Sequence, residues 1–321
     1  MEFISGAAID ALESGLAYMI AFLGVWLAFR VQRAFDLTVG GSFAAGGAIS
    51  AIMISNGSDP WLALLVSSIA AGVAGMVTFC LHRFLGLSVI LASIISNTAM
   101  LSVNLVILGS PTISILQSTS IFDMVAEWTG AGVRSPWLPI IVLSIVGLIV
   151  LASVNFFLNS QRGLAFRMSG INPEMSKSLG VSPTWMLFLA LVVANALAGL
   201  SGSLVTQNQG YADLHMGDTI LIVGLTGILL GELVVRRGLT VPIWGIVAVV
   251  IGSYLYRLLI ALAFRFGIAP QLFSGLTAAI IVAALILNQI ASGASAGWLP
   301  SRKGRLSGAK VSDALKQGEM R

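Results

Sequence analysis

Residues 162–180, with the sequence RGLAFRMSGINPEMSKSLG, form the one long polar interruption in the second half of a strongly apolar chain. The segment contains the basic residues Arg162, Arg167 and Lys177. Because Lys and Arg accumulate in the cytoplasmic loops of membrane proteins, these charges predict that the segment lies on the cytoplasmic side of a membrane. The apolar sequence on either side of it then decides the fold.

The second part of this segment, about 171–180, predicts a short surface helix. Asn172 is a favourable N-cap, Pro173 suits the first helical position, and Glu174 places a negative charge where the helix dipole favours it. Gly180 can end the helix in the left-handed conformation. A few residues suffice to join two membrane spans, so a capped helix is not needed for the connection alone. Its presence predicts that another protein docks there. The alternative is an ordinary amphipathic helix lying on the lipid headgroups.

The composition excludes a soluble domain. Hydrophobic residues make up 57% of the 321 residues, charged residues make up 9%, and the mean hydropathy is +0.97. A soluble domain carries about 25% charged residues. Four runs without any Asp, Glu, Lys or Arg each exceed the roughly 20 residues that a helix needs to cross the hydrocarbon. These runs are 84–122, 135–161, 178–212 and 266–301.

The pattern predicts an all-α, polytopic membrane protein of about nine transmembrane helices. Residues 1–291 form the transmembrane domain in this prediction. Residues 292–321 are Gly/Ser-rich and basic, which predicts a cytoplasmic tail attracted to anionic membrane lipid. The nine spans are expected near 8–29, 38–54, 61–81, 88–109, 137–158, 184–206, 218–235, 240–263 and 271–290.

The distribution of charge predicts the orientation of these spans. With the N-terminus outside and the C-terminus inside, fourteen of the seventeen Lys and Arg residues fall on the cytoplasmic side. The opposite orientation would place those fourteen outside, against the positive-inside rule. The net charge of +4 therefore arises largely from cytoplasmic loops and the tail, and nucleic-acid binding need not be invoked.

The second and seventh predicted spans resemble each other and predict an inverted internal repeat. Both are short and rich in glycine, and Asp36 and Asp218 stand near their N-terminal ends, each followed closely by a threonine. Paired short, glycine-broken segments in corresponding positions of two halves indicate a transport path. The alternative is that the glycines serve close helix packing.

Polar side chains within the spans have two possible roles. Asn97 and Asn104 are seven residues apart, which places them on one helical face. Because an amide facing lipid is costly, this face is expected to meet either other helices or a water-filled path. Arg257 within the eighth span is expected to snorkel outward or to pair with Asp10 or Glu13 near the outer end of the first span.

Catalytic and metal-binding motifs are missing from the sequence. No Gly-x-x-x-x-Gly-Lys-Ser/Thr loop is present, so the chain itself is not expected to bind ATP phosphates. His82 and His215 have no second ligand at metal spacing, no nucleophile motif is recognisable, and the single Cys80 excludes an intrachain disulfide and a cysteine cluster. The chain is therefore expected to be neither an enzyme nor a metal protein.

Four motifs resemble a known family. The pattern Arg167-x-x-Gly-x-Asn-Pro-Glu-Met-x-x-x-Leu-Gly180 is similar to the ATPase-docking loop of the membrane subunits of binding-protein-dependent ABC importers, in the class of branched-chain amino acid and ribose permeases. Three further patterns, Phe35-Asp-Leu-Thr-Val-x-Gly-Ser-Phe43, Gln207-x-Gln-Gly-Tyr-Ala-Asp213 and Gly252-Ser-x-Leu-Tyr-Arg257, resemble the subgroup of tryptophan/tyrosine-type amino-acid uptake permeases.

The resemblance implies a type II ABC importer fold in a bacterial inner membrane. It implies a homodimeric or pseudo-dimeric permease core, two cytoplasmic ATPase subunits that bind ATP and Mg²⁺, and an extracytoplasmic substrate-binding protein. The segment 171–180 would be the coupling helix that enters a groove of the ATPase. The implied ATPase-coupling residues are Arg167, Gly170, Asn172, Pro173, Glu174, Lys177 and Gly180.

The resemblance also implies that the second and seventh spans line the translocation path. The expected solute is an amino acid or a similar small polar molecule. Alternatives are an importer for a sugar or nucleoside, a free-standing secondary transporter and a non-transport scaffold. The predicted path residues are Asp36, Thr38, Ser42, Asn97, Asn104, Asn195, Gln207, Gln209, Tyr211, Asp218 and Thr219.

Overall fold

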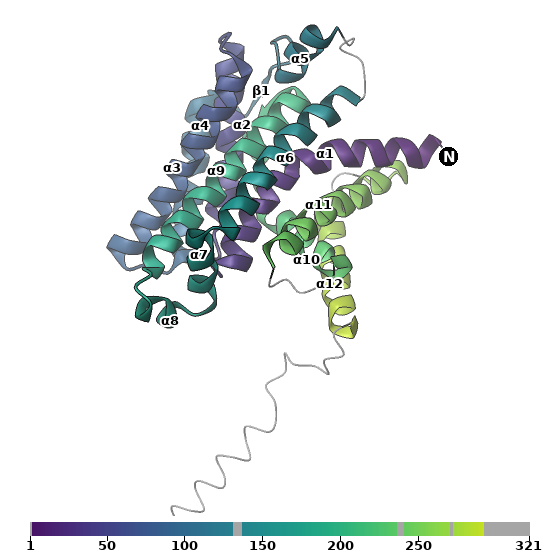
Figure 1. Cartoon of the computed structure of the whole chain (residues 1–321). Coiled ribbons are helices and arrows are strands. Elements are labelled where there is room, and N and C mark those ends of the chain that lie inside the picture. The colour runs from purple at the N-terminus through teal and green to yellow at the C-terminus, as the bar shows by residue number, and fades with distance from the viewer. Residues whose placement is uncertain (1, 131–136, 236–240, 270–271, 292–321) are drawn as a thin grey trace, which may run out of the picture.

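The computed structural model describes residues 2–130, 137–235, 241–269 and 272–291. Helices dominate these residues, and a two-stranded antiparallel ribbon joins two of the connections (Figure 1). The elements in chain order are α1 (Glu2–Trp26), continued by a π-helical turn (Leu27–Val31), α2 (Thr38–Ser55), α3 (Pro60–Leu85), α4 (Val89–Leu108), β1 (Thr112–Ser114), α5 (Ile121–Thr129), α6 (Trp137–Asn159), α7 (Gln161–Ile171), α8 (Pro173–Ser178), α9 (Pro183–Gln209), β2 (Tyr211–Asp213), α10 (Ile220–Val235), α11 (Pro242–Arg265) and α12 (Phe273–Ala291).

Each predicted span corresponds to a helix whose ends lie within a few residues of the expected ones. Among the described residues, seven helices are long and apolar enough to cross a membrane, and two shorter apolar segments lie in α10 and α12. The chain is therefore a polytopic helical protein. The count of nine, the orientation and the inverted repeat stay predictions, and the predicted tail, 292–321, lies outside the described residues.

Local cap residues decide where several helices begin. Asp59 accepts hydrogen bonds from the amides of Trp61 and Leu62 at the start of α3. Ser88 and Ser182 cap α4 and α9 in the same way. A side-chain oxygen at the N-cap satisfies amides that have no partner within the helix. These signals are local, so the helix boundaries follow closely from the sequence.

The helices form two groups that share α1. In one group α2, α3 and α4 pack together with α9, and in the other α10, α11 and α12 pack together (Figure 1). Helix α1 contacts α9 in the first group and α10 and α11 in the second. Residues 19–28 of α1 and the π-helical turn are almost completely buried. The first span is thus a central element of the fold.

The described part of the connection between α4 and α6, residues 109–130, contains a strand and a helix. Strand β1 pairs with β2 across the chain, with Thr112 opposite Asp213, and their side chains share a hydrogen bond of 2.7 Å. Helix α5 begins at a capping box in which Ser120 and Asp123 bond each other's backbone amides. Figure 1 shows α5 and β1 at one end of the helices, whereas α7 and α8 lie at the other end.

Candidate functional site

Helices α7 and α8 form a bent projection, which we call the elbow (residues 161–180), at one end of the bundle (Figure 1). Asn172 lies at the bend. It ends α7 and caps α8, because its Oδ1 accepts a hydrogen bond from the Met175 amide at 3.1 Å. Pro173 occupies the first turn of α8, and Gly180 has φ of +79°. The predicted short helix is therefore present, with α7 preceding it.

The elbow is attached to the end of α1. Gly170 lies so close to the π-helical turn that a Cβ there would collide with the carbonyl oxygen of Val31. Gln32 donates from Nε2 to the carbonyl of Phe166 at 2.5 Å. The buried Phe166 ring packs edge-on against Phe157 of α6, with centroids 5.6 Å apart. The elbow is therefore packed against the end of α1 and against α6.

The outer surface of the elbow carries exposed apolar side chains among polar ones. Ile171, Met175 and Leu179 are 67%, 52% and 60% exposed. Glu174 and Lys177 are exposed and pair with each other at 2.9 Å, so they add little net charge to this surface. Of the other predicted coupling residues, Arg167 is half-buried and Gly170 is buried.

An ion pair next to the elbow joins α1 to α10. Arg30 in the π-helical turn donates from both Nε and Nη2 to the carboxylate of Glu232, with an Nε–Oε1 distance of 2.7 Å. The side chain of Glu232 is only 8% exposed, whereas that of Arg30 is 45% exposed. Bidentate pairing of this kind fixes orientation as well as distance.

Replacing Arg30 by glutamine is expected to lower the free energy of unfolding by about 2 kcal/mol, because a buried carboxylate loses its partner. The apparent melting temperature of the detergent-solubilised chain measures the effect. Arg33→Gln, three residues away at an exposed position, is the matched control. Adding Glu232→Gln to Arg30→Gln should restore part of the loss. Equal melting temperatures for the two single variants would contradict this account.

Several predicted path residues form a buried hydrogen-bond network around the start of α2. Asn195 of α9 donates from Nδ2 to Asp36 Oδ2 at 2.6 Å, and its Oδ1 accepts from the Ser42 hydroxyl at 2.6 Å. Asp36 Oδ1 accepts from the Thr38 amide at 2.9 Å, and the Thr38 and Thr78 hydroxyls lie 2.7 Å apart. Burial raises the pKa of the Asp36 carboxyl, and the hydrogen bonds from Thr38 and Asn195 oppose this shift.

The predicted asparagine face of α4 meets another helix. Asn97 Oδ1 accepts from the amide of Gly41 at 2.7 Å, and Asn104 Nδ2 donates to the carbonyl of Gly41 at 3.0 Å. The two side chains thus bond both polar groups of one residue in α2. Of the two roles expected for this face, interhelical bonding is the one that these contacts display.

The starts of α2 and α10 lie side by side. A Cβ at Gly40 would meet the carbonyl oxygen of Gly217, and a Cβ at Gly217 would meet that of Gly40. Close packing therefore accounts for these glycines. Asp218 and Thr219 follow this contact in the chain, and both are exposed. The Asp218 carboxylate lies 3.0 Å from His215 Nδ1, within hydrogen-bond distance.

The predicted path residues at 207–211 divide into buried and exposed positions. Gln207 is 4% exposed. It accepts from the Ile121 amide at 3.1 Å and donates to the Ser50 hydroxyl and the Pro60 carbonyl, both at 3.3 Å. Gln207 therefore joins α5, α2 and α3. Gln209 and Tyr211 are exposed.

The expected partner of Arg257 is wrong. Asp10 pairs with Arg265 at 3.1 Å, and Glu13 accepts from Asn208 at 2.9 Å. Arg257 instead lies over the ring of Tyr18, with its guanidinium carbon 3.4 Å from the centroid. Arg265 lies eight residues further along α11, and this places it beside the N-terminal part of α1. Sequence spacing carried no signal that could choose between the two arginines.

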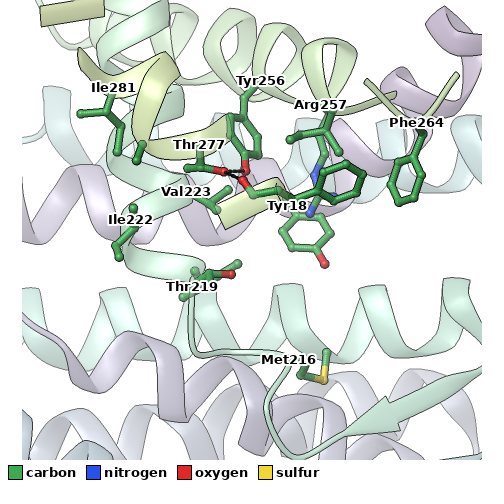
Figure 2. Close-up of a pocket in the computed structure, with 14 residues that line it drawn as sticks. Tyr18, Met216, Thr219, Ile222, Val223, Tyr256, Arg257, Phe264, Thr277 and Ile281 are labelled. Carbon is green, nitrogen blue, oxygen red and sulfur yellow. Dashed lines mark hydrogen bonds between the residues drawn. The ribbon is translucent and has the colours of Figure 1, made fainter. Parts of the chain in front are cut away.

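Arg257 lines a cavity of about 360 Å³ between α1, α10, α11 and α12, which we call the Arg257 cavity. Figure 2 shows Arg257 beside Tyr18, and the hydroxyls of Tyr256 and Thr277 joined by a hydrogen bond of 2.9 Å. Thr219 is the one predicted path residue in its lining. No sequence pattern pointed to Tyr18 or Thr277, whereas Tyr256 belongs to the motif that ends at Arg257.

Nothing in the described part of the chain forms a metal centre, since no three His, Cys, Asp or Glu residues gather closely enough to hold an ion. The geometry offers instead a packed set of apolar helices, buried interhelical polar contacts and an exposed elbow. These are features of a membrane conduit rather than of an active site.

Comparison with known proteins places the chain among transport permeases. The sequence profile of the family described as "Branched-chain amino acid transport system / permease component" matches residues 8–285. A tyrosine transport system permease protein of Clostridioides difficile (strain R20291) is 28% identical over 88% of this chain and 91% of its own length.

Two relatives carry sugar-import names. The fructose import permease protein FruF of Bifidobacterium longum (strain NCC 2705) is 26% identical over 78% of this chain and 63% of its own length. The D-allose transport system permease protein AlsC of Escherichia coli (strain K12) is 24% identical over 63% of this chain and 59% of its own length. Because the family profile covers most of the sequence, the chain belongs to the branched-chain amino acid transport-system permease family and is a multi-pass membrane permease subunit of an ABC transporter, in which a separate subunit hydrolyses ATP.

Proposed function

We propose that two copies of the chain form the conduit of an importer for an amino acid or a similar small polar solute. Two ATPase subunits, which bind ATP and Mg²⁺, dock on the cytoplasmic face, and a binding protein delivers the solute from outside. The tyrosine permease relative, which aligns over most of both chains, supports an amino acid as the solute.

The exposed apolar surface of the elbow is the observation that carries the docking proposal. Ile171, Met175 and Leu179 are exposed apolar side chains on a short helix and bend held by the Asn172 cap. Apolar side chains gathered on a surface mark interaction sites. The basic residues at 162–180 favour the cytoplasmic side for this surface by the positive-inside rule, which supports ATPase docking there.

The contacts behind the elbow supply a route for coupling. Gly170 and Phe166 touch the segment that carries Arg30, and Arg30 binds Glu232 on α10. Helix α10 begins where Gly217 meets Gly40 of α2. A movement driven by ATPase closure would thus reach the starts of both glycine-rich helices. Alternating access needs an element of this kind with two discrete arrangements.

The predicted path residues divide into two roles in this proposal. The buried set holds the helices together and comprises Asp36, Thr38, Ser42, Asn104, Asn195 and Gln207. The partly or fully exposed set is available to solute and comprises Asn97, Gln209, Tyr211, Asp218 and Thr219. A solute needs accessible groups, so the second set forms the better candidates for contact.

Replacing Met175 by aspartate is expected to reduce the amount of ATPase that co-purifies with the tagged permease about tenfold, because a carboxylate would be buried in the interface. ATP-driven uptake into vesicles should fall in parallel. Leu116→Asp is the matched control, because Leu116 is 78% exposed and lies in the connection between β1 and α5, at the end of the bundle opposite the elbow.

Equal ATPase retention by the two variants would contradict docking on the elbow. Uptake by the purified chain in vesicles that lack any ATPase would instead favour a secondary transporter. The sugar-import relatives define the second candidate solute. Uptake of labelled tyrosine by cells that express the whole transporter, measured with and without excess unlabelled fructose, separates the two classes of solute.

A further inference from the structure

We propose that the Arg257 cavity binds the carboxylate of a small amino acid with an apolar or aromatic side chain, with Arg257 as the cation that pairs with it. This inference rests on the proposed function and names a site for the solute within one subunit.

Arg257 carries a charge that is incompletely compensated. It lies eight residues before the end of α11, about 12 Å along the helix at 1.5 Å per residue. The ring of Tyr18 supplies a cation–π contact at 3.4 Å. Its buried Nε has no hydrogen-bond partner among the described residues. Intramembrane cations normally pair with an anion or line a functional path.

The acidic side chains closest along α1 are already engaged. Asp10 binds Arg265 and Glu13 binds Asn208. A ligand carboxylate would complete the arrangement, because the planar guanidinium offers several N–H groups in the geometry that a carboxylate accepts.

The rest of the cavity suits the remainder of an amino acid. Its walls include the side chains of Val223, Ile260, Phe264 and Ile281, which offer an apolar surface. The Tyr256 hydroxyl can both donate and accept a hydrogen bond, and Thr277 is its one partner among the described residues, so it can also bond a ligand. A volume of about 360 Å³ falls at the lower end of the range of roughly 300–1,000 Å³ that small-molecule sites occupy.

The position of the cavity favours a transported solute over a bound lipid. Met216 and Thr219 line it and flank Gly217, which contacts Gly40 at the start of α2. The cavity therefore adjoins the junction of the two glycine-rich helices. A lipid phosphate offers similar anionic chemistry, and the experiment separates it from a carboxylate.

The test uses the full chain in nanodiscs of phosphatidylcholine, which has no net charge, with radiolabelled L-tyrosine as the probe. Tyramine, which lacks the carboxylate, should compete at least about tenfold more weakly than unlabelled tyrosine, a difference of about 1.4 kcal/mol. Arg257→Gln should raise the Kd for tyrosine by at least about tenfold. Arg257→Lys should raise this Kd by less, because lysine keeps the positive charge but lacks the planar guanidinium that binds both carboxylate oxygens. Arg265→Gln, on the same helix and outside this cavity, should leave the Kd unchanged.

The tyramine comparison needs only the native chain, so it holds even where Arg257→Gln fails to fold. Three results would overturn the inference. They are equal competition by tyramine and tyrosine, no tyrosine binding by the native chain, and an unchanged Kd for tyrosine in folded Arg257→Gln. Retention of phosphatidylglycerol by the native chain but not by Arg257→Gln, without tyrosine binding, would assign the cavity to lipid and also overturn it. ATP-driven amino-acid uptake that persists through any of these results would leave the proposed function intact.

Discussion

Replacing Gly46 by alanine is expected to prevent stable assembly of the helix bundle, whereas the same substitution at Gly275 is expected to be harmless. A Cβ at Gly46 would overlap the carbonyl group of Gly199 in α9. Backbone atoms of a packed helix cannot move aside without separating α2 from α9. Gly199 in turn lies against Ser67 and Ala71 of α3, so the three helices meet at this point.

Overpacking at such a contact is expected to cost about 3 kcal/mol. Size-exclusion chromatography of the detergent-solubilised chain measures the fraction of folded, monodisperse protein. Gly275 is the matched control, because it lies in helix α12 and an added Cβ there meets nothing within 4 Å. Alanine should even favour that helix by about 1 kcal/mol. Equal yields of folded protein from both variants would refute close packing as the role of Gly46.

Replacing Asn195 by leucine is expected to destabilise the chain by about 3 kcal/mol, because the buried carboxylate of Asp36 loses a donor at 2.6 Å. Ser42 would lose its acceptor in the same step. A buried polar group that loses its hydrogen bonds cannot regain them from lipid or from apolar side chains. The apparent melting temperature in detergent is the measurement.

Asn159→Leu controls for the change from amide to hydrocarbon, since Asn159 is exposed at the end of α6. Adding Asp36→Asn to Asn195→Leu should restore part of the stability, because the neutral amide is less costly to leave partly unbonded. If the Asn195→Leu variant melts at the same temperature as the native chain, this network contributes little to folding stability.

Much of the architecture could be predicted because its causes are local. An apolar run of this length forms a helix long enough to cross the hydrocarbon, and a helix satisfies the hydrogen bonds of its own backbone. The cap at Asn172 and the left-handed Gly180 depend on neighbouring residues in the same turn. The spacing of Asn97 and Asn104 likewise placed them on one face.

The partners of these side chains could not be predicted. Asn97 and Asn104 share Gly41, and Asn195 reaches Asp36 from a distant part of the chain. The charge pattern of α1 and α11 paired the wrong arginine with Asp10. Each of these outcomes depends on how two helices pack, and helical periodicity within one segment carries no information about the neighbour.

From the sequence alone, the apolar runs predict a polytopic helical membrane protein and Asn172 predicts a short capped helix, because transfer into lipid and helix capping depend on neighbouring residues. The permease family was recognised from motifs that resemble it. The central position of α1, the hydrogen bond from Asn195 to Asp36 and the stacking of Arg257 on Tyr18 beside a cavity emerge only in the folded chain. Those results depend on the distances and angles between helices, which arise when side chains far apart in the chain fill the same space.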